Sequence, residues 1–231
     1  MNLFDKLRSG ASGTSHRCRW AERRCRREGG VEGILEEAAK EFAAKGYDGA
    51  RVDEIAQAAG VNKATLYYQI GDKEALYFAV LDQVMGSLDA AIGQAVEAAE
   101  DAQEKLRQFV LAFSNQDGLM RYVAPIALRE VAAGGVHMPP AAMAHMSHVL
   151  KTLKEIITLG VDRGDFRPAN PMMVHMMIVG SLFFYAANGP LREKVIAATP
   201  GLREAIPFPS MTEAAEHVAD LVIFALKRGD F

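Results

Sequence analysis

From Ile34 to the end of the chain, apolar residues recur every three or four positions, and this helical spacing is the strongest constraint on the fold. The sequence shows no alternation of apolar and polar residues with a period of two, and no hairpin dipeptide with β-branched flanks. No internal repeat of fixed period is visible either. The sequence therefore predicts an all-α protein.

The first third of the chain predicts three short helices followed by one long helix. Gly60 comes directly after the second helix and suits the left-handed conformation that often ends a helix. Asp72 can cap the N-terminus of the long helix. The four helices are expected at residues 34–43, at 52–59, within 60–70, and from 72 to about 99. We expect a compact first domain at 31–75 and a domain boundary within the long helix.

The remainder of the chain, residues 76–231, predicts a larger and more apolar helical bundle. Clusters of Gly and Pro separate its segments of helical periodicity. Beyond the long helix, these segments lie at about 102–115, 119–133, 140–160, 171–188 and 211–228. This half of the chain is expected to form a second domain.

The composition fits a compact protein in water. Half of the 231 residues are hydrophobic, and the mean hydropathy is close to zero. No apolar run approaches the roughly 18 residues needed to span a bilayer, and the N-terminus lacks the apolar segment of an export signal. We therefore expect a cytoplasmic protein with no membrane partner. Cys18 and Cys25 match no common metal or disulfide framework, so free thiols are expected.

The charge is distributed unevenly along the chain. Residues 1–30 carry eight Lys or Arg and three Asp or Glu, a charge of +5, which leaves −8 for the rest of a chain whose total is −3. Such a basic arm can bind the phosphates of a nucleic acid, or it can be a leader without a specific role. The arginines concerned are Arg17, Arg19, Arg23, Arg24, Arg26 and Arg27. The arm is expected to be disordered.

The stretch GVNKATLYYQI, residues 60–70, places two tyrosines and a lysine on one short helix. At 100° per residue, Leu66 and Ile70 share one face, and Tyr68 lies on the opposite face. A tyrosine ring can pack against a sugar or a thymine methyl group while its hydroxyl reaches a phosphate. With the preceding helix and the turn at Gly60, this pattern indicates a helix-turn-helix whose second helix enters the major groove of DNA. The alternative is that the tyrosines only fill a helix interface.

A longer ordered series surrounds this stretch. In chain order its pieces are Ala39 and Phe42, Gly46-Tyr47, Ile55-Ala56, Ala59-Gly60-Val61, Thr65-Leu66-Tyr67 and Asp72-Lys73-Glu74-Ala75-Leu76. On these residues, the segment 34–80 resembles the N-terminal domain of the TetR family of transcriptional regulators. The resemblance implies a helix-turn-helix domain joined through a long helix to a helical domain for ligand binding and dimerisation.

The resemblance also assigns DNA contacts to individual positions. It implies that Lys63, Ala64, Tyr67 and Tyr68 meet base edges or the groove wall, and that Thr65, Gln69 and Lys73 meet phosphates. The N-terminal amides of the long helix attract an anion as well, so Lys73 and the backbone can share one phosphate. Two positions depart from the family pattern. Arg51 stands where a capping Thr or Ser is usual and can instead reach a phosphate, and Ile70 stands where a larger Phe is usual.

For the second domain, the resemblance implies a small-molecule effector and a homodimer. The dimer usually forms through the last two long helices, expected here at 171–188 and 211–228. Residues 163–171 resemble the connector that precedes the first of these helices. Two recognition helices related by a two-fold axis would meet successive major grooves of a pseudo-palindromic operator, about 34–36 Å apart.

Methionines and histidines gather on two of the predicted helices. They are Met143, His145, Met146 and His148 on the first, and Met172, Met173, His175, Met176 and Met177 on the second. Soft metal coordination, ordinary core and dimer packing, and an adaptable apolar pocket all fit this pattern, but carboxylates and cysteines are absent nearby in the sequence. We prefer a pocket, lined by Phe109, Phe113, Tyr122, Met143, Met146, Met176 and Phe183, and we assign no metal and no cofactor.

The leading hypothesis is a homodimeric, DNA-binding repressor that a small apolar or amphipathic ligand releases from its operator. An activator, or a regulator controlled by a protein partner, would keep the same DNA-binding domain. An all-α enzyme is the alternative from another class. The sequence shows no GxSxG, HExxH or phosphate-binding glycine loop, so we expect no enzyme activity.

Overall fold

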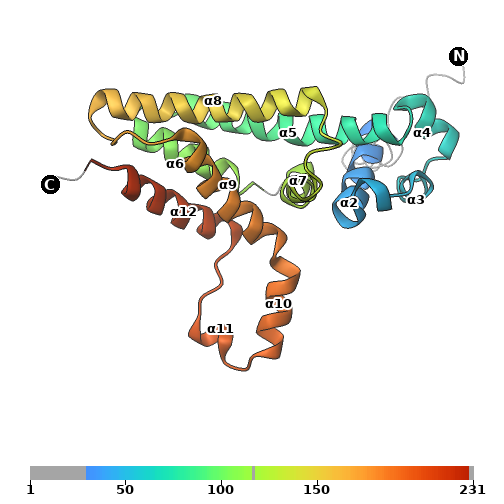
Figure 1. Ribbon diagram of the computed structural model, residues 1–231. Helices are drawn as coiled ribbons and strands as arrows, with labels where there is room; N and C mark the ends of the chain where they lie inside the picture. Colours follow the sequence, from blue (N-terminus) through green and yellow to red (C-terminus); the bar gives the residue numbers. More distant parts are fainter. Residues whose placement is uncertain (1–29, 116–117, 229–231) are drawn as a thin grey trace, which may run out of the picture.

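The computed structural model describes residues 30–115 and 118–228, and over these ranges the chain is built from helices without a strand (Figure 1). Two long helices, α5 (Lys73–Glu97) and α8 (Pro140–Arg163), run side by side along the molecule. Three shorter helices gather at one end of α5. The all-α prediction is confirmed. The basic arm and its arginines lie outside the described residues.

The helices at this end follow the predicted order closely. They are α2 (Val31–Gly49), α3 (Val52–Ala58) and α4 (Lys63–Gln69). The predicted stop at the end of the first helix is a break at Gly46, where φ is +73°, and one further turn runs to Gly49. Gly60 has a φ of +69° after α3, as its place at the helix end predicts. The side chain of Asp72 accepts a hydrogen bond of 2.9 Å from the Ala75 amide and caps α5.

The second half of the chain differs from the prediction at two places. Its elements are α6 (Ala102–Ala112), the 3₁₀ helix η2 (Gly118–Tyr122), α7 (Val123–Ala132), α8, α9 (Pro171–Ala187), α10 (Gly189–Ala198), α11 (Leu202–Ala205) and α12 (Met211–Leu226). The single helix predicted at 119–133 is wrong, because α7 starts so that Pro125 falls in its first turn, where no amide donor is needed. Two helices also fill the stretch after residue 188. Pro190 lies in the first turn of α10, so this proline begins a helix rather than ending one.

Helix α5 is the centre of the structure. Its buried face is Leu76, Tyr77, Val80, Leu81, Val84, Met85, Leu88 and Ile92. By length and composition α5 is the one described helix that could cross a membrane, and the bent pair α9 and α10 passes the same test only when taken together. This corrects the expectation that no segment is long and apolar enough to span a bilayer. The apolar face of α5 packs against α2, α6 and α8, as in the core of a folded domain.

The connector between α8 and α9 is held to the end of α12. The Arg167 amide donates to the Leu226 carbonyl at 2.8 Å, and the Arg228 amide donates to the Asp165 carbonyl at 3.2 Å. Between these bonds, the Phe166 ring is 1% exposed and packs on the backbone of α8 at Gly160. The carbonyl of Gly160 accepts the amides of both residues 165 and 166. The last helix is thereby fixed to the bundle.

Gly160 is the position where this packing is most sensitive to added volume. A Cβ atom there would lie 2.0 Å from the Phe166 ring, so Gly160→Ala must displace the ring. We expect a loss of roughly 1–3 kcal/mol in the free energy of unfolding, measured by urea titration. Gly93→Ala in α5 is the matched control, because a Cβ there has nothing within 4 Å. The control should gain roughly 0.5–1 kcal/mol, and equal stabilities for the two variants would contradict the packing described.

Candidate nucleic-acid interface and apolar cavity

Helix α4 is fixed at its start by an asparagine cap. The Asn62 side-chain oxygen accepts the Thr65 amide at 2.7 Å and the Thr65 hydroxyl at 2.9 Å. Leu66 is completely buried and Ile70 packs partly buried against the same core, as the 100° periodicity predicts. The hydroxyl proton of Thr65 is already used in the cap. To donate to a phosphate, the Thr65 hydroxyl would therefore have to give up its hydrogen bond to Asn62.

The opposite face of α4 is open to solvent. Tyr68 is 92% exposed and Tyr67 is 43% exposed. Ala64 and Gln69 are exposed as well, and the small Ala64 leaves the backbone between the larger side chains accessible. A helix with one completely buried leucine and two uncovered tyrosines has the form of a recognition helix in a helix-turn-helix.

Two basic residues of this end, Lys63 and Arg51, lie close to carboxylates. Lys63 Nζ lies 2.8 Å from Asp53 Oδ1, and the ammonium group lowers the pKa of the Asp53 carboxyl below its usual range. Arg51 caps α3 without a side-chain hydrogen bond, and its Nε lies 3.9 Å from Glu54. The Arg51 side chain is 70% exposed, so it remains free to move toward a phosphate. The weak cap that the sequence predicts at this position is confirmed.

Lys73 points toward the end of α2. Its Nζ donates to the Asp48 carbonyl at 3.2 Å and lies 4.9 Å from the centre of the Tyr47 ring. The carboxylate of Asp72 occupies the amide of residue 75 at the N-terminus of α5. The predicted sharing of one phosphate between Lys73 and the amides of α5 thus has to compete with this cap. Lys73 is the first residue of α5, so it still lies at the N-terminus of this helix.

Helix α7 connects the α2–α4 unit to the rest of the protein. The Arg129 guanidinium donates to the carbonyl groups of Ala43 and Ala44 in α2, at 2.9 and 2.5 Å. The next residue, Glu130, is 2% exposed and accepts a hydrogen bond of 2.5 Å from the Tyr77 hydroxyl on α5. Burial and the neighbouring carboxylate raise the pKa of Tyr77, so its hydroxyl remains a donor. Sequence reasoning missed these partners, because nothing in a local pattern relates α7 to α2.

An apolar cavity of about 60 Å³ lies between α5, α8 and α9. It is lined by Met85, Leu88, Phe113, Ala127, His145, Met146, Val149, His175, Val179 and Phe183. Of the seven residues predicted for a ligand pocket, the structure brings Phe113, Met146 and Phe183 together here. The others lie elsewhere: Phe109 is buried in the core beside Phe113, Tyr122 is half-buried, and Met143 and Met176 are 49% and 48% exposed. Two further lining residues, His145 and His175, belong to the methionine and histidine pattern of the sequence, although they were not assigned to the pocket. The others are ordinary apolar positions of their helices, so no local signal distinguished them.

Two histidines of α8 meet carboxylates of α5. Asp89 lies 3.0 Å from His145 Nδ1 and 2.6 Å from His148 Nδ1, and Asp82 lies 3.3 Å from His145 Nε2. The expectation that no carboxylate lies near these histidines is therefore wrong. Asp89 is 56 positions from His145 in the sequence, but the fold brings the two side chains together. Within the described part of the chain, no group of three such side chains has an arrangement suited to a metal ion. The cluster joins α5 to α8.

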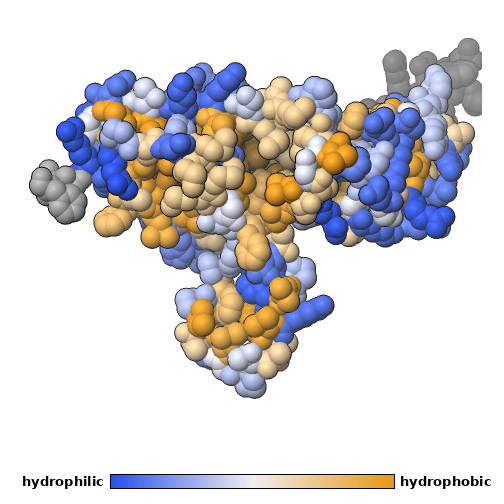
Figure 2. Space-filling model, in the orientation of Figure 1, coloured by the Kyte–Doolittle hydropathy of each residue, from blue (hydrophilic) through white to orange (hydrophobic). Residues whose placement is uncertain are grey.

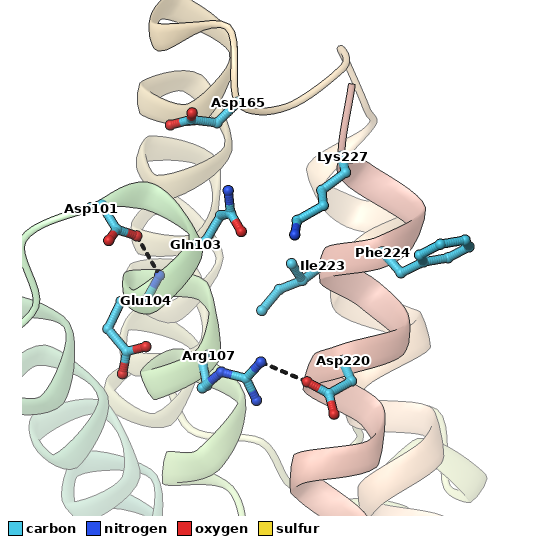
Figure 3. Close-up of a pocket in the computed structure, with 9 residues that line it drawn as sticks. All are labelled: Asp101, Gln103, Glu104, Arg107, Asp165, Asp220, Ile223, Phe224 and Lys227. Atoms are coloured by element: carbon cyan, nitrogen blue, oxygen red, sulfur yellow. Dashed lines mark hydrogen bonds and ion pairs between the residues drawn. The ribbon is translucent and has the colours of Figure 1, made fainter. Parts of the chain in front are cut away.

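A larger groove of about 540 Å³ opens at the end of the molecule away from α4. It is lined by Asp101, Gln103, Glu104, Arg107, Asp165, Asp220, Ile223, Phe224 and Lys227. Figure 3 shows Ile223 of α12 and Lys227, the residue after this helix, pointing into the groove, while the Phe224 ring points away. Arg107 bonds to Asp220 across the groove at 2.6 Å. The walls are polar and charged, unlike the pocket that the sequence predicted.

Two protein-family models match the chain. The model described as bacterial regulatory proteins, tetR family, matches residues 34–80, which hold α4 and its cap. The model described as tetracyclin repressor-like, C-terminal domain, matches residues 99–204. Together the two matches cover the helices that form the candidate interface and much of the bundle around the cavity.

Individual relatives agree with these models. The HTH-type transcriptional regulator RutR of Escherichia coli strain K12 is 29% identical over 191 residues, which is 80% of this chain and 86% of RutR. The HTH-type transcriptional repressor NicS of Pseudomonas putida is 26% identical over 160 residues, 68% of this chain and 76% of NicS. Among solved structures, the TetR family transcriptional regulator PfmR of Thermus thermophilus aligns with a TM-score of 0.60 and 29% identity, over 85% of this chain and 96% of PfmR. The chain belongs to the TetR family of transcriptional regulators.

Proposed function

We propose that this regulator is a homodimeric repressor that binds a pseudo-palindromic operator and is released from it by a small apolar or amphipathic effector. The observation that carries the proposal is the exposed face of α4, where Tyr68 is 92% exposed on a helix that Leu66 anchors completely. A large aromatic side chain left in water on a short helix has no stabilising role in the isolated protein. Contact with a DNA groove gives it one.

The homodimer is supported by uncovered apolar side chains on α9 and α12. Met173, Met177 and Phe184 repeat on one face of α9 and are 60%, 53% and 64% exposed. On α12, Leu221 and Phe224 are 67% and 79% exposed. Figure 2 shows hydrophobic residues gathered over the middle of the molecule and on the projection formed by α10 and α11. Apolar surface of this extent marks an interaction site, and family members usually dimerise through the two corresponding helices.

The effector is proposed to bind in the apolar cavity. Helix α5 supplies Met85 and Leu88 to its wall and begins at Lys73, beside the DNA-binding helices. A ligand that binds better to a conformer with a tilted α5 shifts the population toward that conformer and away from DNA. The size of the effect is limited by the difference between the ligand's affinities for the two conformers.

The repressor is favoured over the alternatives by the relatives. NicS, which matches over most of this chain, is named a repressor, and membership of a regulator family gives an enzyme activity no support. An activator or a partner-controlled regulator would share the DNA-binding surface, and transcription from an operator-linked reporter separates them from a repressor. As a DNA-binding regulator, the protein is proposed to act in the cytoplasm.

Truncation of Tyr68 tests the recognition surface. Tyr68→Ala should weaken binding to operator DNA by about 1–3 kcal/mol, the range of one base-edge contact, without changing thermal stability. Mobility shift with the DNA upstream of the gene itself measures the affinity. Tyr68→Phe, which keeps the ring, is the matched control and separates the contribution of the hydroxyl. If the folded Tyr68→Ala dimer bound the operator with wild-type affinity, Tyr68 would not be part of the recognition surface.

Arg51 is predicted to contact a phosphate, and this contact has a signature in salt dependence. Removing one phosphate contact should reduce the steepness of log affinity against log salt concentration by about 0.9 for each DNA-binding domain. The reduction should be the same for all DNA sequences. The comparison is between Arg51→Ala and Lys154→Ala, an exposed cation on α8 far from α4. Equal slopes for these two variants would exclude a phosphate contact at Arg51.

The proposed dimer interface can be broken by a charge. Phe224→Asp on α12 should convert the dimer to a monomer in sedimentation equilibrium and abolish operator binding at concentrations where the wild type binds. Val131→Asp is the matched control, because Val131 is 74% exposed on α7, outside the proposed interface. A dimeric Phe224→Asp variant with normal DNA binding would show that α12 does not form the interface.

A further inference from the structure

The cavity between α5, α8 and α9 combines apolar walls with two imidazole rings. We infer that the effector is an uncharged molecule, apolar except for one hydroxyl or carbonyl group, and that His175 binds this group. The inference rests on the proposed effector role of the cavity and specifies the chemistry of the ligand. It follows from three properties of the site: its apolar lining, the absence of lysine and arginine among the lining residues, and an unpartnered nitrogen.

The walls of the cavity favour an apolar body. Leu88 of α5, Phe113, Val149 of α8 and Phe183 of α9 surround the space. The rings of Phe113 and Phe183 are 5.9 Å apart and tilted by 59°, so together they form one aromatic side of the cavity. Met146 completes the lining, and its flexible side chain lets the volume of about 60 Å³ adapt to a ring or a short chain.

The charges around the cavity disfavour an anionic ligand. The residues that line the cavity include neither lysine nor arginine. His145 is the first polar group there, and both of its ring nitrogens already lie near carboxylates, Asp89 and Asp82. A ligand carboxylate would thus find no lysine or arginine and would lie close to the two carboxylates that His145 already contacts, which is unfavourable.

His175 is the second polar group and has no such partner. Its Nδ1 is buried without a hydrogen bond to any described residue. Burial lowers the pKa of this imidazole below its ordinary value, so the ring is neutral at neutral pH. A neutral imidazole has one donor and one acceptor, and a hydroxyl or carbonyl on an otherwise apolar ligand supplies the missing bond. An imidazole that lines an apolar cavity and has an unsatisfied nitrogen therefore favours a ligand with a single polar group.

Three aromatic probes of similar size test the inference on the full chain. Toluene is apolar, p-cresol adds one hydroxyl, and benzoate carries a negative charge. By titration calorimetry and thermal shift, p-cresol should bind about fivefold to tenfold more tightly than toluene, as one hydrogen bond provides, and benzoate should not bind. Equal binding of toluene and p-cresol, tighter binding of benzoate, or no binding of p-cresol at its solubility limit would each overturn the inference.

Variants assign the preference to His175. His175→Leu fills a similar volume without a polar atom, so it should still bind toluene and should lose the preference for p-cresol. Met146→Leu changes the same lining without touching the imidazole and should keep the preference. If His175→Leu retains the preference in a protein with unchanged thermal unfolding, another group binds the hydroxyl and the assignment to His175 is wrong.

Operator release is measured separately, so that the two proposals can fail independently. Suppose that p-cresol binds with the preference assigned to His175 but leaves the operator complex intact at saturation. The inferred ligand chemistry would then be correct, and the proposed effector role of the cavity would be wrong. If an anionic compound releases the operator and competes for the cavity, the repressor mechanism holds and the inferred ligand class is wrong.

Discussion

The hydrogen bond between the Tyr77 hydroxyl and the buried carboxylate of Glu130 sets how the DNA-binding helices are attached to the protein. Glu130 is 2% exposed, and a carboxylate this deeply buried is costly unless it is paired. The bond joins α7 to α5 just one turn after Lys73. Arg129, the neighbour of Glu130, holds two carbonyl groups at the end of α2. One turn of α7 thus fixes both helices that support α4.

Helix α5 is held at two points. One is the Tyr77 bond to Glu130, and the other lies beside the cavity between α5, α8 and α9. From Lys73 to Met85, α5 rises about 18 Å at 1.5 Å per residue, so the DNA end and the cavity end belong to one rigid element. At the cavity end, the pairs of His145 with Asp82 and Asp89 tie α5 to α8. Under the proposed mechanism, a ligand in this cavity would shift this end of α5, and the Tyr77 bond would be the pivot about which α5 tilts relative to α2 and α4.

The sequence predicts those features that depend on local periodicity and local capping. The inward position of Leu66, the exposure of Tyr68 and the cap at Asp72 follow from 100° per residue and from side-chain chemistry at a helix end. The order of the first four helices also followed from this spacing, and the family resemblance added the assignment of DNA contacts to individual positions. The cavity needed contacts between helices far apart in the chain, and a run of methionines does not show which of them face inward. Met146 lines the cavity and Met143, one turn earlier, does not, although the two side chains are almost equally exposed, at 45% and 49%.

The balance of charge at the recognition end bears on the proposed homodimer. Lys63 is paired with Asp53, and Lys45 contacts both Glu41 and Glu54, so carboxylates offset much of the positive charge near α4. Nonspecific binding to phosphates depends on unpaired cations, so these pairs reduce it for one DNA-binding unit. Linking two units makes the second binding event intramolecular and raises the overall affinity only if the spacing matches the operator. In the proposed homodimer, a small tilt of α5 in both copies would change that spacing and would so favour release from the operator.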